Sequence, residues 1–441
     1  MPEAIDARLA GQIYDFVAGD EDARLCRDIP DSQCQEQPVN FVAQTTAQAL
    51  SKTGDALADS KVVLPWLLGA VGAPAFFVGL LVPIRESLAL LPQILVGGVI
   101  RRVPIRKGFW AGASLAQGAC ILAMAALALG GMTGTAAGWS IIALLTLFSL
   151  ARGVASIAAK DVLGKTVSKG RRGRVSGQAA TLSGLTAGAV GAYLMLSPEG
   201  TRPEWLLYAL IGAAGACWLV AAAAFMRTVE YPGATEGGRS LGDLVADQMR
   251  LLARDRDLQL FIAARALMIS TALVAPLYVT LAQQRTGETL DGLGWLMIAS
   301  GLASAVSASF WGVFADRSSR ATMALAATIA GVLGLGVVWA LATLPSAGDH
   351  IAFYAAILFV LGIAHAGVRI GRKTHVVDLA GGDRKAEYVA LSNTVIGVLL
   401  LLTGAFVGFL MGFGVTMAIA VLSVLALAGA ALAMMMPNVQ A

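Results

Sequence analysis

Charged side chains interrupt several long apolar segments of this sequence, where a charge needs either a partner or a function. The first such segment carries Asp55 and Asp59, one helical turn apart on one face, and the second carries Arg85 and Glu86. Withdrawal from water favours the neutral form of a carboxyl group, which can then bind and release a proton near neutral pH. We therefore take these four residues as candidates for proton coupling or substrate binding.

The same residues could instead form a structural ion-pair cluster that holds two helices together. The sequence leaves both interpretations open. Asp59 and Glu86 are favoured for function because several carboxylates compete for the single Arg85.

Three other segments contain one ionisable residue each. Arg152 lies deep in its segment, where it could hold an anionic group, and His365 is a candidate for the same site or a polar packing residue. Arg265 lies near one end, where we expect its side chain to reach the membrane surface. Asn393 is expected to hydrogen-bond to a neighbouring helix.

The elements that position these residues follow from composition. A chain of 441 residues that is 57% hydrophobic and 14% charged has too few charges to cover a water-soluble globule. Segments of about 20 apolar residues are long enough to cross a bilayer as helices. We predict an all-α integral membrane protein with twelve transmembrane helices, at about 43–70, 74–100, 108–130, 137–159, 175–196, 204–226, 258–282, 291–315, 321–343, 351–371, 387–411 and 414–436.

Lysine and arginine are unequally divided between the loops on the two sides. The loops on the side of the amino terminus hold nearly all of them, while the opposite loops hold only Arg202 and Arg285. Loops rich in these residues stay in the cytoplasm. We therefore expect a multi-pass protein of the cell (inner) membrane with both termini in the cytoplasm.

Two segments lie outside the predicted spans. Residues 1–40 form an acidic cytoplasmic segment without an apolar run, in which Cys26 and Cys34 predict neither a disulfide nor a zinc site. Residues 227–257 form a linker whose second part has one apolar helical face, which indicates a helix on the membrane surface. These segments delimit two six-helix halves, 41–226 and 258–441.

An internal repeat supports the division into halves. The segment from Arg152 to Val175 resembles the segment from Ala366 to Val389, and each runs from the end of one helix to the start of the next. The basic loop at 101–107 likewise corresponds to 316–320. We infer two pseudo-symmetric halves related by an axis along the membrane normal.

One motif resembles a known family. Residues 312–320 read Gly-Val-Phe-Ala-Asp-Arg-Ser-Ser-Arg, similar to the Gly-x-x-x-Asp-Arg-x-x-Arg motif of the major facilitator superfamily. The resemblance implies a cavity lined by the first, fourth, seventh and tenth helices. It also implies a cytoplasmic gate formed by Gly312, Asp316, Arg317 and Arg320. In the first half, Gly97 is in register, but Arg101 stands where the family has aspartate, so the first half departs from the motif.

These observations favour a transporter over an enzyme. The sequence contains no phosphate-binding loop of the Gly-x-x-x-x-Gly-Lys type and no set of residues typical of a hydrolase or a metal site, and we expect no cofactor. We predict a secondary transporter of a small solute that works by alternating access, is coupled to protons, and is a monomer without a nucleic-acid partner. The alternative is a non-transporting protein of this fold that binds or delivers a hydrophobic partner or assists membrane assembly.

Overall fold

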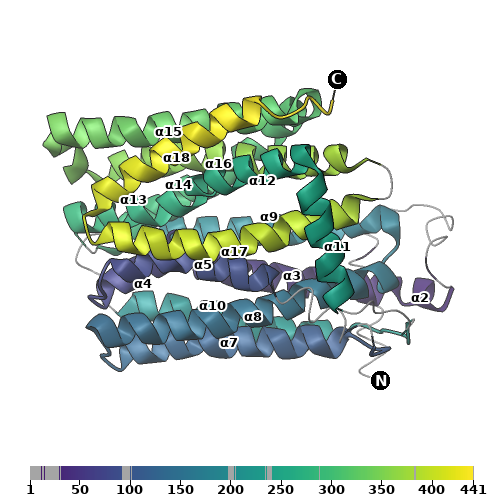
Figure 1. Ribbon diagram of the computed structural model, residues 1–441. Helices are drawn as coiled ribbons and strands as arrows, with labels where there is room; N and C mark the ends of the chain where they lie inside the picture. The colour runs from purple at the N-terminus through teal and green to yellow at the C-terminus, as the bar shows by residue number, and fades with distance from the viewer. Residues whose placement is uncertain are drawn as a thin grey trace.

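The computed structural model describes residues 11, 14, 29, 31–91, 100, 102–196, 203, 205–233, 235, 241–287, 289–381 and 384–440. These residues form a bundle of helices (Figure 1). The helices are α2 (Asp31–Gln35), α3 (Gln37–Leu57), α4 (Val63–Ala70), α5 (Phe76–Leu90), α7 (Lys107–Leu129), α8 (Gly134–Thr166), α9 (Lys169–Leu196), α10 (Trp205–Met226), α11 (Leu241–Arg254), α12 (Arg256–Met268), α13 (Ser270–Thr286), α14 (Leu290–Arg317), α15 (Ser319–Thr343), η2 (Pro345–Asp349), α16 (Ile351–Ala380), α17 (Lys385–Met411) and α18 (Val415–Met434).

Ten of the helical segments in the described part of the chain are long and apolar enough to cross a membrane. They correspond to the third to twelfth predicted spans, with α12 and α13 together forming the seventh. The first two predicted spans correspond to α3 with α4 and to α5, which are shorter or more polar than this criterion requires. Part of the second predicted span, 92–99, lies outside the described residues.

The first predicted span is not one helix, as we expected for 43–70. Helix α3 begins earlier, at Gln37, and ends at Leu57, and α4 starts only at Val63. The Asp59 carboxylate accepts hydrogen bonds from the backbone N–H groups of Lys61 (2.8 Å) and Val62 (3.0 Å). A side-chain acceptor of this kind satisfies the backbone donors that a helix start leaves free. The break is therefore stabilised by one of the candidate carboxylates.

Two other helices extend further than predicted. Helix α8 continues to Thr166 rather than 159, and α16 continues to Ala380 rather than 371. The predicted ends marked where apolar residues give way to charged ones, which is where a helix leaves the bilayer and not where it must end. Arg372 and Lys373 therefore lie beyond the predicted end at 371, on the same helix α16 as Arg369.

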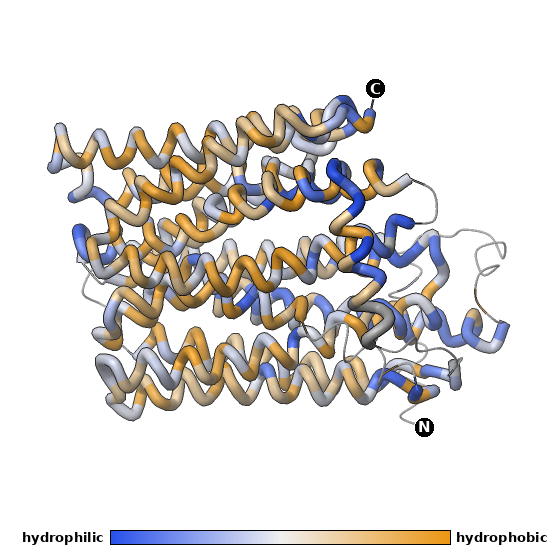
Figure 2. The backbone as a smooth tube through the Cα atoms, in the orientation of Figure 1, coloured by the Kyte–Doolittle hydropathy of each residue, from blue (hydrophilic) through white to orange (hydrophobic). Residues whose placement is uncertain are grey.

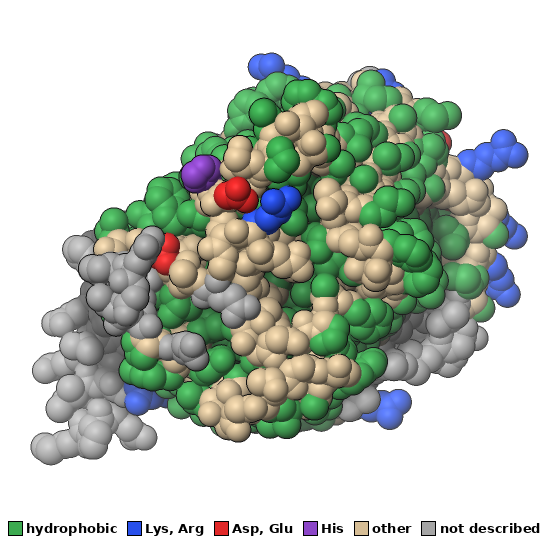
Figure 3. All heavy atoms as spheres, turned by 90° about the vertical axis from the view of Figure 1, so that its left-hand side faces the viewer, with side chains coloured by type: hydrophobic (Ala, Val, Ile, Leu, Met, Phe, Trp, Pro, Cys, Tyr) green, Lys and Arg blue, Asp and Glu red, His purple; other side chains and the backbone are tan. Residues whose placement is uncertain are grey.

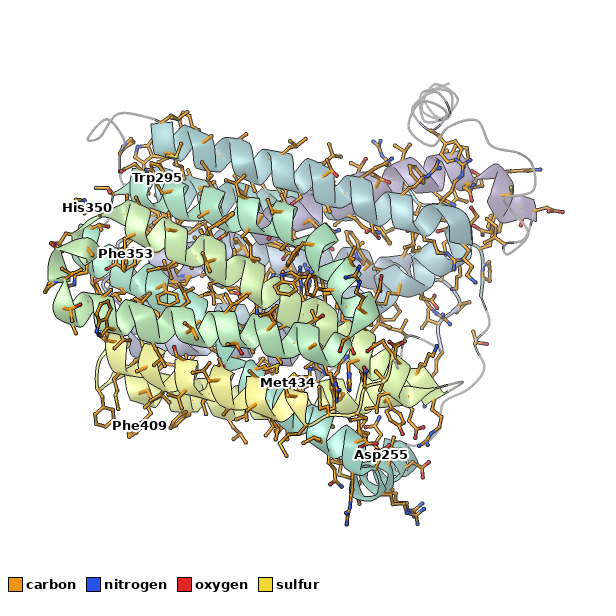
Figure 4. All side chains as sticks on the ribbon, turned by 90° about the horizontal axis from the view of Figure 1, so that it is seen from above. Asp255, Trp295, His350, Phe353, Phe409 and Met434 are labelled. Atoms are coloured by element: carbon orange, nitrogen blue, oxygen red, sulfur yellow. The ribbon has the colours of Figure 1, made fainter. Side chains whose placement is uncertain are left out.

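Both termini lie at the same end of the bundle, which we call the termini end (Figure 1). Helix α11 crosses the bundle there, as expected for the linker, and hydrophilic residues gather at this end (Figure 2). Trp295, His350, Phe353 and Phe409 lie at the opposite end, away from Asp255 (Figure 4). That opposite end shows few charged side chains on its visible face (Figure 3). The asymmetry agrees with the distribution of basic loops in the sequence.

The two halves meet along two pairs of helices. Helix α5 packs against α17, and α9 packs against α14. In the numbering of the spans, the first pair joins the second span with the eleventh, and the other pair joins the fifth with the eighth. In a repeat of six helices the second span corresponds to the eighth and the fifth to the eleventh. The repeat therefore converts one pair into the other. Helix α4 of the first span also packs against α13 of the seventh. The arrangement is that of two pseudo-symmetric halves, as the repeat predicts.

Glycines allow close approach in both pairs, toward the opposite end. A Cβ atom on Gly79 would lie 2.7 Å from the backbone nitrogen of Gly408, and one on Gly294 would lie 2.5 Å from that of Met195. Only residues without a side chain let two helices come this close.

The cysteine prediction was wrong at one residue. Cys34 is disulfide-bonded, whereas Cys120 and Cys217 are free. Spacing in a sequence does not show which sulfur atoms a fold brings together. Gly97 and Arg101, in the first-half counterpart of the motif, lie outside the described residues.

Candidate functional site

Two adjoining cavities lie between the halves. The first, which we call the central cavity, has a volume of about 320 Å³ and is lined by α3, the break before α4, α9, α13, α14 and α16. The second, which we call the basic cavity, has a volume of about 570 Å³ and is lined by α5, α12, α13, α16 and α17. Lys61, His365 and Arg369 line both cavities. Each cavity thus receives side chains from both halves of the chain.

Lys61 and His365 meet where the cavities adjoin. The Lys61 Nζ lies 3.3 Å from the His365 Nε2, and the His365 Nδ1 lies 3.1 Å from the Thr271 hydroxyl. Since the Lys61 ammonium can only donate, Nε2 must be the acceptor and the ring must be neutral with its proton on Nδ1. His365 is therefore a cavity residue and not merely a packing residue. Sequence spacing does not pair Lys61 with His365, because the two residues are 304 positions apart.

The basic cavity is lined by five cationic side chains and one carboxylate. The cations are Lys61, Arg265, Arg369, Arg372 and Lys373, and the carboxylate is Glu86. In the part of the chain that the structure describes, none of these six side chains forms an ion pair within 4 Å. The formal charge of this lining is +4, from five positive charges and one negative charge.

Asp55 is the centre of an ion-pair cluster within the first half. Its two carboxylate oxygens bind Arg85 from α5 and Arg152 from α8. The Arg85 guanidinium also stacks over the Phe148 ring, 4.4 Å from the ring centre. These ion pairs join α3, α5 and α8. They agree with the interpretation of the cluster as a structural one that holds helices together.

The other members of the predicted cluster lie elsewhere. Asp59 lines the central cavity but uses its carboxylate to cap the break before α4. Glu86 is exposed and lines the basic cavity. Arg152 lines a third cavity of about 230 Å³ within the first half, away from the two that adjoin. The fourth span therefore contributes no residue to the central cavity, contrary to what the resemblance implies.

Arg265 does not extend to the membrane surface, so that expectation was wrong. Its side chain is buried and donates to the Ser392 hydroxyl and to the Asn393 side-chain oxygen at 2.9 Å. Both acceptors come from α17, so Arg265 turns inward to reach them. Asn393 thus accepts a hydrogen bond from a neighbouring helix, as the sequence predicts.

The motif segment is held within the second half. Arg320 donates to the backbone oxygen of Met436 at 2.7 Å, and the Ser319 hydroxyl lies 2.9 Å from the Gln440 side-chain oxygen. Asp316 and Arg317 are exposed, and neither has an ion-pair partner in the described part of the chain. Gly312 lies one helical turn before Asp316 on α14. Of the predicted gate residues, Arg320 is thus held within the second half, whereas the side chains of Asp316 and Arg317 are exposed.

The corresponding loop of the first half is held in a similar way. The backbone N–H groups of Arg106 and Lys107 donate to the buried Glu230 carboxylate at 2.8 Å and 2.7 Å. Glu230 follows α10, the sixth span, as Met436 follows α18, the twelfth. In both halves the chain after the last helix anchors the loop after the second span, which agrees with an internal repeat.

The opposite end of the cavities is closed by contacts between α4 and α13. Gln283 donates from its side-chain nitrogen to the backbone oxygen of Trp66 at 3.1 Å, and both residues are buried. Gln283 also fills the space beside Gly69, where a Cβ atom would lie 1.9 Å from its oxygen. Glu86, Arg369 and Lys373, which line the basic cavity, are exposed. The contacts of Gln283 therefore close the cavities at the opposite end.

Comparisons with known proteins agree with this architecture. The sequence model of the Major Facilitator Superfamily matches residues 260–439. No curated protein matches the sequence. The structure is similar to a variant of the nucleoside transporter NupG, with a TM-score of 0.68 and 12% identity over 89% of this chain and 99% of that one.

Two other solved structures are similar over nearly their whole length. The peptide transporter POT has a TM-score of 0.65 and 14% identity, covering 90% of this chain and 94% of that chain. The D-xylose-proton symporter has a TM-score of 0.61 and 12% identity, covering 91% and 98%. Identities this low establish the fold alone.

The fold and the cavities between its halves define an α-helical, multi-pass membrane protein. The resemblance indicated by the motif is confirmed: this is a protein of the major facilitator superfamily fold.

Proposed function

We propose that the protein is a secondary transporter that moves a small solute across the membrane by alternating access and is coupled to protons. The observation that carries this proposal is the contact of Lys61 with His365 where the two cavities adjoin. Lys61 belongs to the first half and His365 to the second. A rocking motion of the halves would therefore change the distance between these two side chains while the solute is bound. The similarity to solved transporters supports the same conclusion.

The contacts between halves fit alternating access. Closure at the opposite end depends on one hydrogen bond from Gln283 and on close contacts at glycines such as Gly79 and Gly294. Packed contacts without ion pairs can separate as rigid surfaces. The exposed Asp316 and Arg317 would provide the corresponding closure at the termini end, as the motif resemblance implies.

Among the candidate carboxylates, the geometry favours Glu86 for proton coupling. Asp55 is held by two arginines, and Asp59 by two backbone N–H groups, so each has a structural role that needs its negative charge or its acceptors. Glu86 faces the basic cavity without an ion pair in the described part of the chain. A proton can therefore reach it when the cavity is open to water.

The test uses purified protein in liposomes, supplied with pools of small solutes, with and without a pH gradient. We expect gradient-driven accumulation of at least one solute, together with exchange of that solute in the absence of a gradient. Glu86→Gln should abolish accumulation and leave exchange largely intact, because exchange requires no net movement of protons. Glu387→Gln, in an exposed ion pair with Arg384, is the matched control.

Three outcomes separate the parts of the proposal. If no pool is transported by stable protein, the protein is not a transporter, and binding of a hydrophobic partner becomes the better hypothesis. If Glu86→Gln loses accumulation, Glu86 couples transport. If Glu86→Gln and Asp59→Asn both accumulate solute normally, neither carboxylate couples transport and the proton proposal fails.

A further inference from the structure

We propose that the solute is an organic anion with at least two negative charges, a phosphate ester or a dicarboxylate, and that the basic cavity binds its charged groups. This inference rests on the proposed function and adds the substrate class. It follows from the excess of positive charge in the basic cavity, the position of these charges, and the contrast between the two cavities.

The charge excess is costly without an anion. On α16, Arg372 and Lys373 lie three and four residues after Arg369. Side chains at this spacing are neighbours on a helix, so their like charges repel. Glu86 is the one carboxylate of the cavity lining. A ligand with two negative charges would lower the formal charge of the site from +4 to +2.

The rule that cytoplasmic loops are basic does not explain the position of Lys61, which lies at the break between α3 and α4 in the interior of the bundle. Its ammonium contacts the neutral His365 imidazole and forms no ion pair within 4 Å among the described residues. The nearby negative charge is the Asp59 carboxylate, which caps the same break through backbone N–H groups. An anion in the basic cavity would give Lys61 a direct partner.

Arg265 adds a donor that is built into the wall. It is buried and fixed by two neutral side chains of α17, which orient the guanidinium without neutralising it. Its Nε atom is buried and has no hydrogen-bond partner in the described part of the chain. Guanidinium groups bind carboxylate and phosphate oxygens through paired hydrogen bonds. Arg265 therefore adds a fixed positive charge to the wall of the basic cavity.

The central cavity indicates that the anion has an organic body. Apart from the residues that it shares with the basic cavity and the Asp59 carboxylate, which caps the break before α4, its lining is apolar or hydroxylated, and includes Ala275, Leu358, Ser300 and Ser304. An inorganic ion would leave this space unfilled. A molecule with a charged end in the basic cavity and a neutral body in the central cavity would fill both.

The test measures binding, independently of transport. Detergent-purified protein is mixed with compounds in pairs, each pair joining a phosphorylated or dicarboxylic compound with the neutral compound of the same carbon skeleton. We expect at least one anion to raise the Tm and its neutral counterpart to have no effect. The shift should weaken at high salt, since charged groups that face an open cavity are screened.

Matched variants locate the binding. Arg372→Gln should weaken binding of the active anion by roughly 10- to 100-fold, the scale of one lost charge-assisted hydrogen bond. Arg285→Gln makes the same chemical change at the opposite end, where Arg285 faces Asp349 at 3.6 Å, and should leave binding unchanged. Equal binding by wild type and Arg372→Gln would place the anion elsewhere and overturn the proposal.

Other outcomes of the binding test also support or overturn the anion proposal. A panel in which only neutral compounds bind, or in which no anion raises the Tm, overturns the anion proposal but leaves the transporter proposal intact. Binding of an anion that is never transported in liposomes supports the anion site and contradicts the transporter. Stabilisation by phosphatidylglycerol but by no soluble anion would assign the cavity to a lipid headgroup and overturn the proposal.

Discussion

The Lys61 ammonium and the His365 imidazole meet across the two halves, with Nζ 3.3 Å from Nε2. Lys61 belongs to the break between α3 and α4, and His365 lies in the middle of α16. The contact therefore joins the part of the first half that departs from regular helix with a regular helix of the second half. Any movement of one half on the other must change it.

Replacing Lys61 with methionine should lower solute exchange by about 10-fold or more while changing thermal stability little. The substitution removes a donor from both cavities, and lost hydrogen bonds to charged groups are worth about 1.5 to 3 kcal/mol. Stability should change little because Lys61 forms no ion pair within 4 Å among the described residues, and because the nearby Asp59 keeps its two backbone hydrogen bonds. Exchange rates in liposomes and the Tm in detergent measure the two effects. Exchange at the wild-type rate would show that Lys61 is no part of the pathway.

Asp55→Asn should destabilise the protein, in contrast to Lys61→Met. Loss of the carboxylate leaves Arg85 and Arg152 as unpaired charges within the bundle, which costs about 3 to 5 kcal/mol. The Tm and the yield of folded protein should both fall. The double variant Asp55→Asn with Arg152→Gln should regain part of the loss, because it removes one stranded charge.

The control for Asp55 is Asp349→Asn, which breaks an exposed ion pair with Arg285. Such pairs contribute about 0 to 1 kcal/mol, so its Tm should be close to that of wild type. If Asp55→Asn is as stable as this control and fails in transport instead, Asp55 has a functional role and the structural interpretation of the cluster is wrong.

Gly79→Ala should weaken closure at the opposite end. The added Cβ would lie 2.7 Å from the backbone nitrogen of Gly408, which cannot move without shifting α17. A cysteine in place of Ser300, in a background without native cysteines, should then react faster with an impermeant thiol reagent from that end. Gly188→Ala, where a Cβ meets open space, should leave the reaction rate unchanged. Equal rates for the two variants would mean that the α5–α17 contact does not control closure.

Asp316→Asn should favour the state that is open at the termini end. In the present state Asp316 is exposed and has no ion pair among the described residues, so its loss should cost this state less than about 0.5 kcal/mol. If it pairs across the halves in the other state, only that state loses stability. Labelling of cysteines placed at the two ends should show more reaction from the termini end and less from the opposite end. Unchanged labelling at both ends would exclude a gating role for Asp316.

The sequence predicted the fold better than the site, for a physical reason. Apolar length and basic loops report on the bilayer, so the positions of spans such as those at 108–130 and 414–436 could be predicted within a few residues. Arg265 could not be placed, because its direction depends on Ser392 and Asn393, more than 120 residues away. The cavity cations Arg372 and Lys373 were missed because helix α16 continues beyond its apolar part. Contacts between distant residues leave no periodic signal in a sequence.

The polarity of α3 has a consequence for how the chain enters the membrane during synthesis. Buried polar residues such as Asn40 and Gln44, together with Lys52 and Asp55, leave α3 below the apolar threshold that ten other segments exceed. A charge at the centre of an isolated helix costs about 2.5 to 3.5 kcal/mol on insertion scales. Asp55 finds its first partner on α5 and its second, Arg152, only on α8. We therefore expect the first span to become stable in lipid only after the fourth span has been made, because Arg152 is then available to Asp55.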